Sequence, residues 1–362
     1  MIDININDTK IPKSFVHLSK HIYPEQIFSQ DNQEEIDFLF SEQNQFFKTG
    51  KAAYSIIDQK IRVALFFDEA NIYQNKKVAY FGYWETINEV ALNKELFADC
   101  EKWAKEQGAE LLIGPINFNT YNKYRLNTTI KNDSSFLNEP QNPAYYPHLL
   151  KESGFMVLNE YVSYIVETKT KIEKWFEIYE KKKDLLTFDD YHFELITPEL
   201  WLENIEEIHK KSEIVFGDNF AYSPVDFNTF KVKYGTFFPY MICSKTSLFA
   251  FDSNKKIIGT IINFPNYLSL IQQKMPITNF NYKSYSENVK NKTLLLKTVG
   301  MVKEHSHMGY LLIAMLLKII PNALEYYDDY VFCLMQKGNY PSMLGKEFSD
   351  FTKTYALYIK EL

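Results

Sequence analysis

Two histidines and a glycine lie close together between a strand-like run and an apolar helix in the second half of the chain. The stretch reads KTVGMVKEHSHMGYLLIAMLL and contains His305, His307 and Gly309. Residues of these types can serve three kinds of chemistry: binding of a metal ion, activation of a nucleophile, or binding of an anion. An ordinary turn between a strand and a helix is the fourth interpretation.

The spacing of these residues disfavours a metal ion or a serine nucleophile. His305 and His307 are two residues apart, which suits one side of a strand rather than one face of a helix. Apart from Glu304, no carboxylate or cysteine lies at ligand spacing from them. Ser306 lacks the G-x-S-x-G frame that holds a nucleophilic serine on a strained turn.

An anion cradle is better supported. The first turn of a helix has unpaired N–H groups and the positive end of the helix dipole. Gly309 would let an anion approach the backbone closely. The helix that follows, Leu311–Leu317, is apolar all round, so it should be buried against a sheet and hold its N-terminus rigidly. On these residues alone, a phosphate cradle and a turn without a ligand are about equally well supported.

The same stretch resembles the pyrophosphate loop of the GNAT (Gcn5-related N-acetyltransferase) superfamily, whose pattern is [RQ]-x-x-G-x-[GA]. Gly309 matches this pattern, whereas Ser306 replaces the Arg or Gln and Leu311 replaces the last small residue. The resemblance implies that the loop holds the pyrophosphate of acetyl-CoA or a longer acyl-CoA, through Ser306, His307, Met308, Gly309, Tyr310 and Leu311.

A second segment resembles the same family. Asn339-Tyr-Pro-Ser342 is similar to the family's N-x-x-[AS] on its fourth helix, whose Asn commonly contacts the cofactor. The tyrosine that often follows as general acid is replaced by Lys346, and Tyr340 is the nearest phenol.

The resemblance also implies roles for the strand before the loop. Main-chain groups of Val299, Met301 and Val302 would contact the pantetheine arm and the thioester oxygen. His305 is the candidate base, since the ordinary pKa of histidine is about 6.5. Glu304 is a second candidate base, acting through water, and Tyr340 is the candidate acid. The alternatives are a surface histidine and a tyrosine that simply packs in the cleft.

Apolar and aromatic side chains gather before this strand. They could line a tunnel for a longer acyl group or simply pack in the core. They are Phe237, Phe238, Tyr240, Met241, Phe264, Tyr267, Leu268 and Leu270.

The pattern of strands and helices predicts an α/β protein. In the first half, residues 77–86 form a strand, a capping box Thr86-x-x-Glu89 starts a helix that ends near Gly108, and 109–115 and 156–167 form further strands. In the second half, Thr197-Pro198 starts a helix and residues 247–264 form a hairpin.

Further elements of the second half surround the loop. Strands are expected at 293–302, at 330–336 and at the C-terminus, with a short helix at 339–348. The helix that follows Gly309 should end at Pro321.

The first half resembles tandem GNAT-like bacterial proteins of the YghO type. The matching segments are Tyr23–Phe28, Ser41–Phe67, Ala79–Thr86, Gly114–Asn122 and Tyr145–Phe155. The turn that corresponds to the pyrophosphate loop has no glycine here and carries Glu85 and Glu89, whose charges oppose an anion. The chain also departs from the family at 127–141, on the acceptor side.

The fold implied is two tandem GNAT-like domains, each a mixed, mainly antiparallel sheet flanked by helices. The length of 362 residues agrees with two domains. We expect residues 1–170 to form a domain without catalytic activity, 171–190 a linking helix, and 191–362 a domain that binds acyl-CoA.

Composition restricts the cellular compartment and the classes of binding partner that we expect for this chain. A net charge of −6 argues against nucleic acid as a partner. Three widely spaced cysteines with no C-x-x-C suit a reducing, cytoplasmic compartment. The N-terminus has no features of a signal peptide, and no apolar run is long enough to span a membrane.

The function expected is N-acyl transfer from acyl-CoA, or from an acyl carrier protein, to an amine of a small molecule or peptide, without a metal ion. The alternative is a non-catalytic protein that binds acyl-CoA or a peptide. A role of the first domain in recognising a peptide or carrier-protein acceptor is compatible with both.

Overall fold

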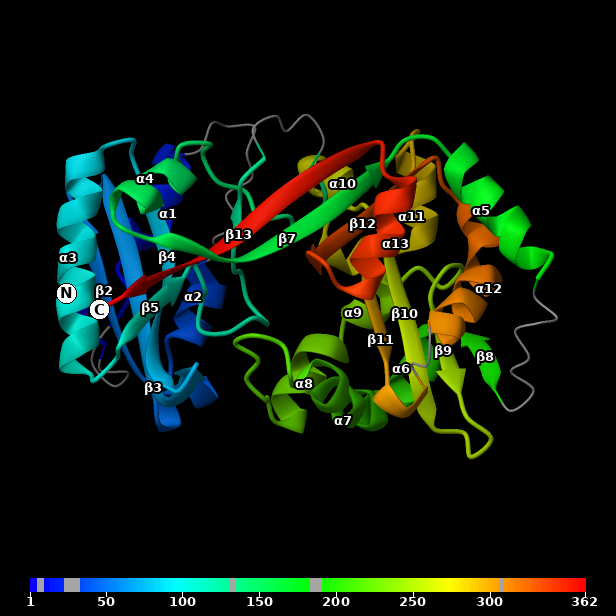
Figure 1. Cartoon of the computed structure of the whole chain (residues 1–362), viewed down its shortest axis with the longest axis horizontal. Coiled ribbons are helices and arrows are strands. Elements are labelled where there is room, and N and C mark those ends of the chain that lie inside the picture. Colours follow the sequence, from blue (N-terminus) through cyan, green and yellow to red (C-terminus); the bar gives the residue numbers. More distant parts are fainter. Residues whose placement is uncertain (5–9, 23–32, 130–134, 183–190, 306–308) are drawn as a thin grey trace. The chain divides into compact units, whose positions relative to one another are not determined.

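The computed structural model describes residues 1–4, 10–22, 33–129, 135–182, 191–305 and 309–362 (Figure 1). The chain divides into two compact units. The first unit contains residues 1–131, 140–160 and 354–362, and the second contains residues 132–139 and 161–353. This division differs from the expected boundaries at 170 and 191, because each unit includes a segment from the other half of the chain.

The first unit is built on a mixed sheet with the strand order β1-β2-β3-β4-β5-β13. The neighbouring strands are antiparallel except for β4 and β5, which are parallel. Its strands are β1 (Ile2–Asp3), β2 (Lys51–Ile57), β3 (Ile61–Tyr73), β4 (Lys76–Thr86), β5 (Leu111–Gly114), β6 (Leu126–Asn127) and the end of β13 (Phe351–Glu361).

Helices cover both faces of this sheet. Phe97 of α3 and Leu149 of α4 pack with Phe81 of β4 in one core. On the other face, Phe15 of α1 contacts the Tyr83 ring at 6.2 Å between centroids. The helices are α1 (Lys13–Ile22), α2 (Gln33–Leu39), the 3₁₀ turn η1 (Gln45–Lys48), α3 (Val90–Glu106) and α4 (Tyr146–Glu152).

The second unit has the strand order β7-β12-β11-β10-β9-β8, in which β11 and β12 are parallel and the other pairs are antiparallel. Its sheet and helices confirm the expected mixed, mainly antiparallel α/β class. Its strands are the end of β7 (Met156–Val166), β8 (His192–Leu195), β9 (Leu248–Phe251), β10 (Ile257–Pro265), β11 (Thr293–Met301) and β12 (Asp329–Gln336).

Helices also cover both faces of the second sheet. A Cβ atom added at Gly259 would meet Met315 of α12, and one added at Gly300 would meet Val215 of α7. The helices are α5 (Thr170–Glu180), α6 (Pro198–Glu203), α7 (Ile205–Phe216), α8 (Phe227–Tyr234), α9 (Phe238–Met241), α10 (Leu268–Gln272), α11 (Tyr282–Asn288), α12 (Tyr310–Tyr326) and α13 (Tyr340–Phe348), with 3₁₀ turns η3 (Ile277–Asn279) and η4 (Lys303–His305).

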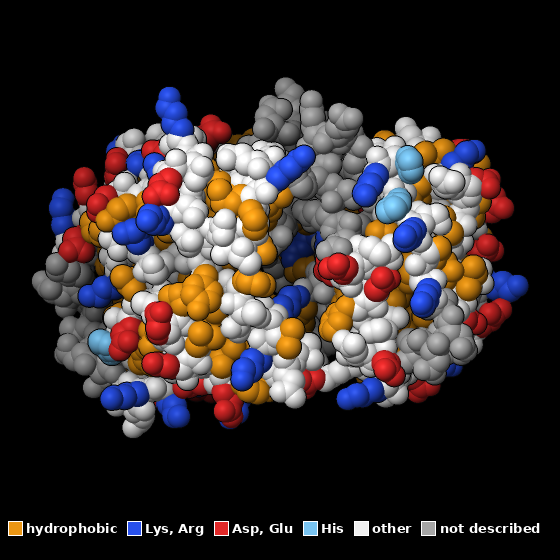
Figure 2. Space-filling model, turned by 180° about the vertical axis from the view of Figure 1, so that it is seen from behind, with side chains coloured by type: hydrophobic (Ala, Val, Ile, Leu, Met, Phe, Trp, Pro, Cys, Tyr) orange, Lys and Arg blue, Asp and Glu red, His pale blue; other side chains and the backbone are white. Residues whose placement is uncertain are grey.

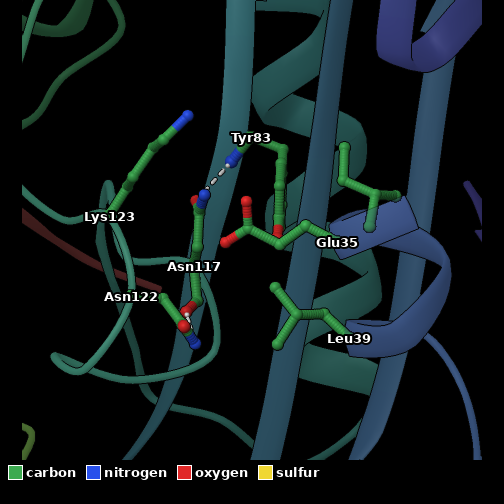
Figure 3. A pocket seen from close by; sticks show the side chains of 7 residues that line it. Glu35, Leu39, Tyr83, Asn117, Asn122 and Lys123 are labelled. Carbon is green, nitrogen blue, oxygen red and sulfur yellow. Dashed lines mark hydrogen bonds between the residues drawn. The ribbon is translucent and has the colours of Figure 1, made fainter. Parts of the chain in front are cut away.

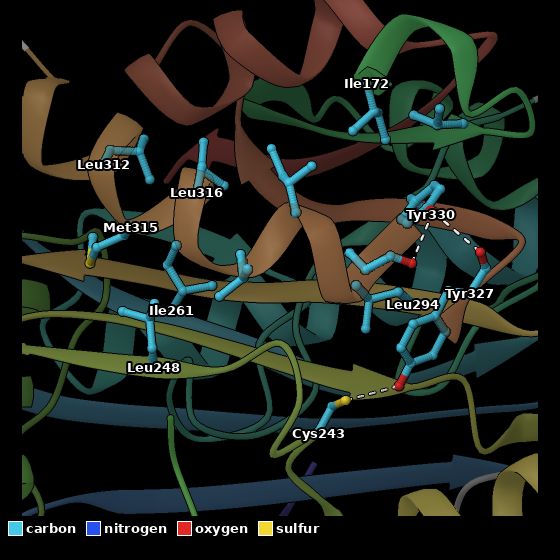
Figure 4. Close-up of a cluster of buried hydrophobic side chains, with 14 of the residues drawn as sticks. Ile172, Cys243, Leu248, Ile261, Leu294, Leu312, Met315, Leu316, Tyr327 and Tyr330 are labelled. Carbon is cyan, nitrogen blue, oxygen red and sulfur yellow. Dashed lines mark hydrogen bonds between the residues drawn. The ribbon is translucent and has the colours of Figure 1, made fainter. Parts of the chain in front are cut away.

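The core of the second unit lies between α12 and its sheet (Figure 4). Met315 and Leu316 of α12 pack over Ile261 of β10, and all three are buried. The Tyr327 hydroxyl donates to Cys243 Sγ at 3.0 Å, and the Tyr330 hydroxyl donates to the carbonyl of residue 323 at 3.1 Å. These bonds satisfy the polar ends of buried aromatic side chains.

One strand from each half of the chain extends into the unit that is formed mainly by the other half. The end of β7, from Tyr161, belongs to the second unit and pairs with β12. The end of β13, from Thr354, belongs to the first unit and pairs with β5, where Tyr358 lies opposite Gly114. Each sheet is therefore completed by a strand from the other half.

Two expected helix boundaries are wrong. Helix α3 begins at Val90 rather than after a cap at Thr86, because Thr86 is the last residue of β4 and its N–H donates to the Tyr146 hydroxyl at 2.9 Å. Helix α12 continues past Pro321 to Tyr326. An internal proline costs about 3 kcal/mol, and buried residues on both sides of it, Ile320 and Ala323 among them, hold the helix against the core.

The surface shows a mixed distribution of charge. Side chains of both charge signs are scattered over the face seen in Figure 2, among hydrophobic ones. No helix among the described residues is both long and apolar enough to cross a membrane.

Candidate functional site

Strands β11 and β12 separate part-way along their length. Four Cα pairs join them, from Thr293 opposite Asp329 to Leu296 opposite Phe332. Beyond this point β11 continues to Met301 paired with β10, and β12 continues to Gln336 paired with β7. Two parallel strands that stop pairing while both continue leave an opening between them, with its closed end at Leu296.

A β-bulge in β11 lies at the closed end of this opening. Ile262 of β10 pairs with Thr298, and the next residue of β10 pairs with Leu296, so Lys297 is the extra residue of β11 at this bulge. A bulge of this kind bends the strand and redirects its groups, and bulges are frequent next to active sites.

The bonding pattern of β11 shows which main-chain groups face the opening. The N–H of Val302 donates to the Ile258 carbonyl of β10 at 2.9 Å. In an antiparallel pair, alternate residues point their N–H and C=O groups toward the partner strand. The N–H groups of Val299 and Met301 therefore point into the opening, whereas the N–H of Val302 is already bonded.

The end at which β11 and β12 diverge leads to the N-terminus of α12. Gly309 precedes this helix with φ +72°, a left-handed conformation that favours glycine. Leu311, Leu312 and Met315 bury the first turns of α12 in the core, as the sequence predicted. The helix terminus is thus rigid at this edge of the sheet. Ser306, His307 and Met308 lie outside the described residues.

The two candidate bases lie at this same end. His305 ends the η4 turn and is half-buried, and its Nδ1 lies 2.7 Å from the Tyr191 hydroxyl oxygen. Glu304 is exposed. A strand rises about 3.3 Å per residue, so the bulge at Lys297 is about 16 Å from Val302. His305 therefore lies near the helix terminus and far from the closed end of the opening.

Helix α13 begins at the end of β12. Asn339 is its N-cap residue, and its side-chain oxygen accepts the Ser342 N–H at 2.9 Å. Because β11 and β12 are parallel, both strands end at the same edge, so Asn339 lies at the edge that also holds Gly309. Only the backbone of Tyr340 is described, and its expected role as acid is not tested.

In the first unit the corresponding gap between β4 and β5 is filled, and Figure 3 shows the Asn117 side chain hydrogen-bonded to Tyr83 there. Strands β4 and β5 pair from Val78 to Tyr80, and a bulge follows at Tyr83, whose φ is +49°. The chain after β5 then crosses the gap: Ile116 donates its N–H to the Phe81 carbonyl at 2.7 Å. Asn117 fills the remaining place, because its Oδ1 accepts the Tyr83 N–H at 2.8 Å.

Two contacts show how tightly this gap is filled. A Cβ atom added at Gly82 would lie 2.4 Å from the Ile116 carbonyl oxygen and 2.6 Å from Asn117 Oδ1. The Tyr83 N–H at the bulge thus already donates a hydrogen bond to Asn117. A small pocket remains beside it, lined by Glu35, Ile36, Leu39, Tyr83, Asn117, Asn122 and Lys123 (Figure 3).

Carboxylates surround the start of α3 in the first unit. Glu89 is the exposed N-cap residue of α3. Glu85 accepts the Tyr146 hydroxyl at 2.7 Å and lies 3.8 Å from the buried Arg62 guanidinium. Glu89 therefore places a negative charge at the helix terminus that corresponds to Gly309, whereas the charge of Glu85 is paired with that of Arg62.

All three cysteines are buried free thiols. Burial raises the pKa of the Cys333 thiol to about 11 and also raises the pKa of Cys100. A thiol of raised pKa is a poor nucleophile at neutral pH. We therefore expect no reaction of the folded protein with Ellman's reagent at pH 8 and three reactive thiols after unfolding. A thiol that reacts in the folded protein would instead indicate that this cysteine could act as a nucleophile in a covalent mechanism.

The remaining candidates are also placed by the structure. Of the aromatic cluster, Tyr267 and Leu270 are fully buried core residues, whereas Phe237 and Tyr240 are about half exposed, at 46% and 52%. Within the described part of the chain, no three His, Cys, Asp or Glu side chains lie close enough together to hold a metal ion.

No protein-family model and no curated protein sequence matches this chain. Among solved structures, a conserved protein of unknown function from Enterococcus faecalis V583, described as a probable N-acyltransferase, aligns with a TM-score of 0.50 and 11% identity over 96% of this chain and 70% of its own. The two proteins share a fold. At this identity the likeness extends no further than fold.

Two further structural neighbours bear GNAT names. A tandem GNAT protein from the clavulanic acid biosynthesis pathway aligns with a TM-score of 0.49 and 9% identity, over 99% of this chain and 97% of its own. A GCN5-related N-acetyltransferase from Sphaerobacter thermophilus aligns with a TM-score of 0.42 and 10% identity, over 96% and 90%. Both scores are too low to support an argument.

Proposed function

We propose that the chain is an N-acyltransferase whose second unit moves an acyl group from acyl-CoA, or from an acyl carrier protein, to an amine. The observation that supports this most is the β11–β12 opening: the N–H groups of Val299 and Met301 point into it along one edge, and it ends at the Gly309 terminus of α12. An extended thioester donor needs both features, a row of donors for its arm and a site for its diphosphate.

In this proposal the donor lies along β11. Its diphosphate binds at Gly309 and the first turn of α12, with Tyr310 and Leu311 as the first residues of the helix. The main-chain groups of Val299 and Met301 bond to its arm. The acyl carbonyl then lies toward the bulge at Lys297.

The reaction proposed is direct attack of the amine on the thioester. The neutral amine nitrogen forms a bond to the carbonyl carbon, and the oxygen carries the negative charge that a main-chain N–H stabilises. The C–S bond breaks, the thiolate leaves, and the amine proton goes to a base or to solvent. Holding the two reactants in line supplies much of the rate enhancement.

We propose that the first unit does not bind the donor in this way. Asn117 Oδ1 accepts the Tyr83 N–H at its bulge, and Glu89 places a negative charge at the helix terminus where a diphosphate would need a positive field. This supports a recognition or structural role for the unit, including the recognition of a peptide or carrier-protein acceptor.

Isothermal titration with acetyl-CoA tests the proposal directly. We expect saturable binding of one equivalent, and release of free CoA when a panel of primary amines is added. Binding without CoA release on any amine would favour the alternative, a non-catalytic acyl-CoA-binding protein. No binding of acetyl-CoA or of a longer acyl-CoA would refute an acyl-CoA donor.

The position of His305 leads to a separate prediction. Because His305 lies at the α12 end, we expect His305→Ala to raise the KM for acetyl-CoA about tenfold and to change kcat only a few-fold. The measurement is the steady-state rate of CoA release over about pH 6–9. A loss of kcat of about 100-fold with unchanged KM would instead identify His305 as the general base.

A further inference from the structure

A short segment from the first half of the chain is built into the second unit. Residues 135–139 belong to this unit. Asn266, which follows β10, holds the segment in two places: its Oδ1 accepts the Leu137 N–H at 3.0 Å, and its Nδ2 donates to the Ser135 carbonyl at 3.2 Å. One side chain thus fixes the backbone on both sides of Phe136.

An ion pair fixes the other end of the segment. Lys353 Nζ lies 2.8 Å from Glu139 Oε1 and 3.0 Å from Oε2, and both side chains are fully buried. Glu139 Oε2 also accepts the Phe136 N–H at 3.4 Å. Removal of either charge would leave the other buried without its partner, which is costly. The segment is therefore anchored at both ends.

The segment places Phe136 beside the closed end of the β11–β12 opening. Lys297, the bulge residue, has its Nζ 5.3 Å from the centre of the Phe136 ring, and Lys353 Nζ is 5.6 Å from the same centre. An ammonium group over the face of an aromatic ring, within about 6 Å of its centre, interacts favourably with it. Phe136 itself is only 1% exposed, so it is packed on nearly all sides.

We propose that Phe136 closes the acyl end of the opening and restricts the donor to a short acyl group. This inference rests on the proposed function. A donor bound at Gly309 and along Val299 brings its acyl group to Lys297. Each further CH₂ group must then displace Phe136 or the aliphatic part of Lys297, and close-packed interiors accept extra methylenes poorly.

Isothermal titration of the full chain with CoA, acetyl-CoA and hexanoyl-CoA tests this role. The wild-type protein should bind acetyl-CoA at least about tenfold more tightly than hexanoyl-CoA, since a pocket discriminates by roughly this factor or more when the acyl group does not fit. Phe136→Ala should remove most of this preference and leave the affinity for CoA unchanged, because CoA has no acyl group. Phe136→Leu, which removes less volume, should reduce the preference in the same direction.

A matched control separates this effect from general destabilisation. Phe230 is also a buried aromatic residue of the second unit, 4% exposed, but it lies in α8 and contacts His209 and Tyr234. Phe230→Ala should leave the ratio of the two affinities unchanged.

The outcomes distinguish the inference from the proposed function. A wild-type preference for hexanoyl-CoA, or Phe136 variants with the same ratio as Phe230→Ala, overturns the role of Phe136 while the proposed function stands. If the wild-type protein binds neither CoA nor either ester, the proposed acyl-CoA function and this inference both fail.

Discussion

Gly309→Glu is expected to lower the affinity for acetyl-CoA by about 5- to 700-fold. The substitution puts a carboxylate at the terminus of α12, where we place the diphosphate of the donor. Two charges of the same sign about 4 Å apart near a protein surface repel by roughly 1–4 kcal/mol, and every 1.4 kcal/mol changes a dissociation constant about tenfold. Isothermal titration with acetyl-CoA measures the effect.

Gly309→Gln is the matched control. Both variants place a side chain of the same size on a residue with φ +72°, so both carry the same backbone strain of about 1–2 kcal/mol. The difference between them therefore reports charge alone. Equal affinities for Gly309→Glu and Gly309→Gln would show that no diphosphate lies at this terminus.

Lys353→Met is expected to lower the free energy of unfolding by about 3–5 kcal/mol, because it leaves the buried Glu139 carboxylate without its ion-pair partner. Urea denaturation followed by tryptophan fluorescence measures this loss. The double variant Glu139→Leu with Lys353→Met should recover most of it, since replacing a whole buried pair with apolar residues is often neutral.

The surface pair between Lys171 and Asp350 provides the comparison. Their closest atoms are also 2.8 Å apart, but the side chains are 44% and 25% exposed. Solvent screens such a pair, so Lys171→Met should cost no more than about 1 kcal/mol. A similar small loss for Lys353→Met would mean that residues 135–139 are not held by the ion pair.

Local signals in the sequence predicted much of the secondary structure. The helix start at Thr197 is confirmed, because its side-chain oxygen accepts the Leu200 N–H at 3.2 Å. The hairpin turn at Asp252 is confirmed, because its Oδ1 accepts the N–H groups of Asn254 and Lys256. In both cases the interacting residues are at most four positions apart, so the sequence contains the whole signal.

Features that depend on distant residues could not be predicted in this way. The closure of the first opening joins Tyr83 to Asn117, and the anchoring of residues 135–139 joins them to Asn266 and Lys353. No periodicity or motif marks such pairs. The continuation of α12 through Pro321 likewise depends on a core that the local rule for proline does not include.

The glycine and the apolar helix directed the prediction to the α12 end of β11, and the Lys297 end was not predicted. The sequence pointed to the loop before α12 because Gly309 and the two histidines are unusual residues there. The bulge at Lys297 and the end of β11–β12 pairing depend on which strands lie side by side. Phe136 likewise reaches Lys297 only through the fold, so no local pattern in the sequence indicates its position.

The exchange of strands between the two halves also determines the order in which the protein can be completed during translation. Strand β5 leaves the ribosome long before β13, and β13 is its neighbour in the first sheet. Until residues 354–362 emerge, the β13-facing edge of β5 has no strand to pair with. Unpaired edges promote aggregation. The first unit is thus synthesised first but completed last, and a chain that stops before Thr354 leaves it unfinished.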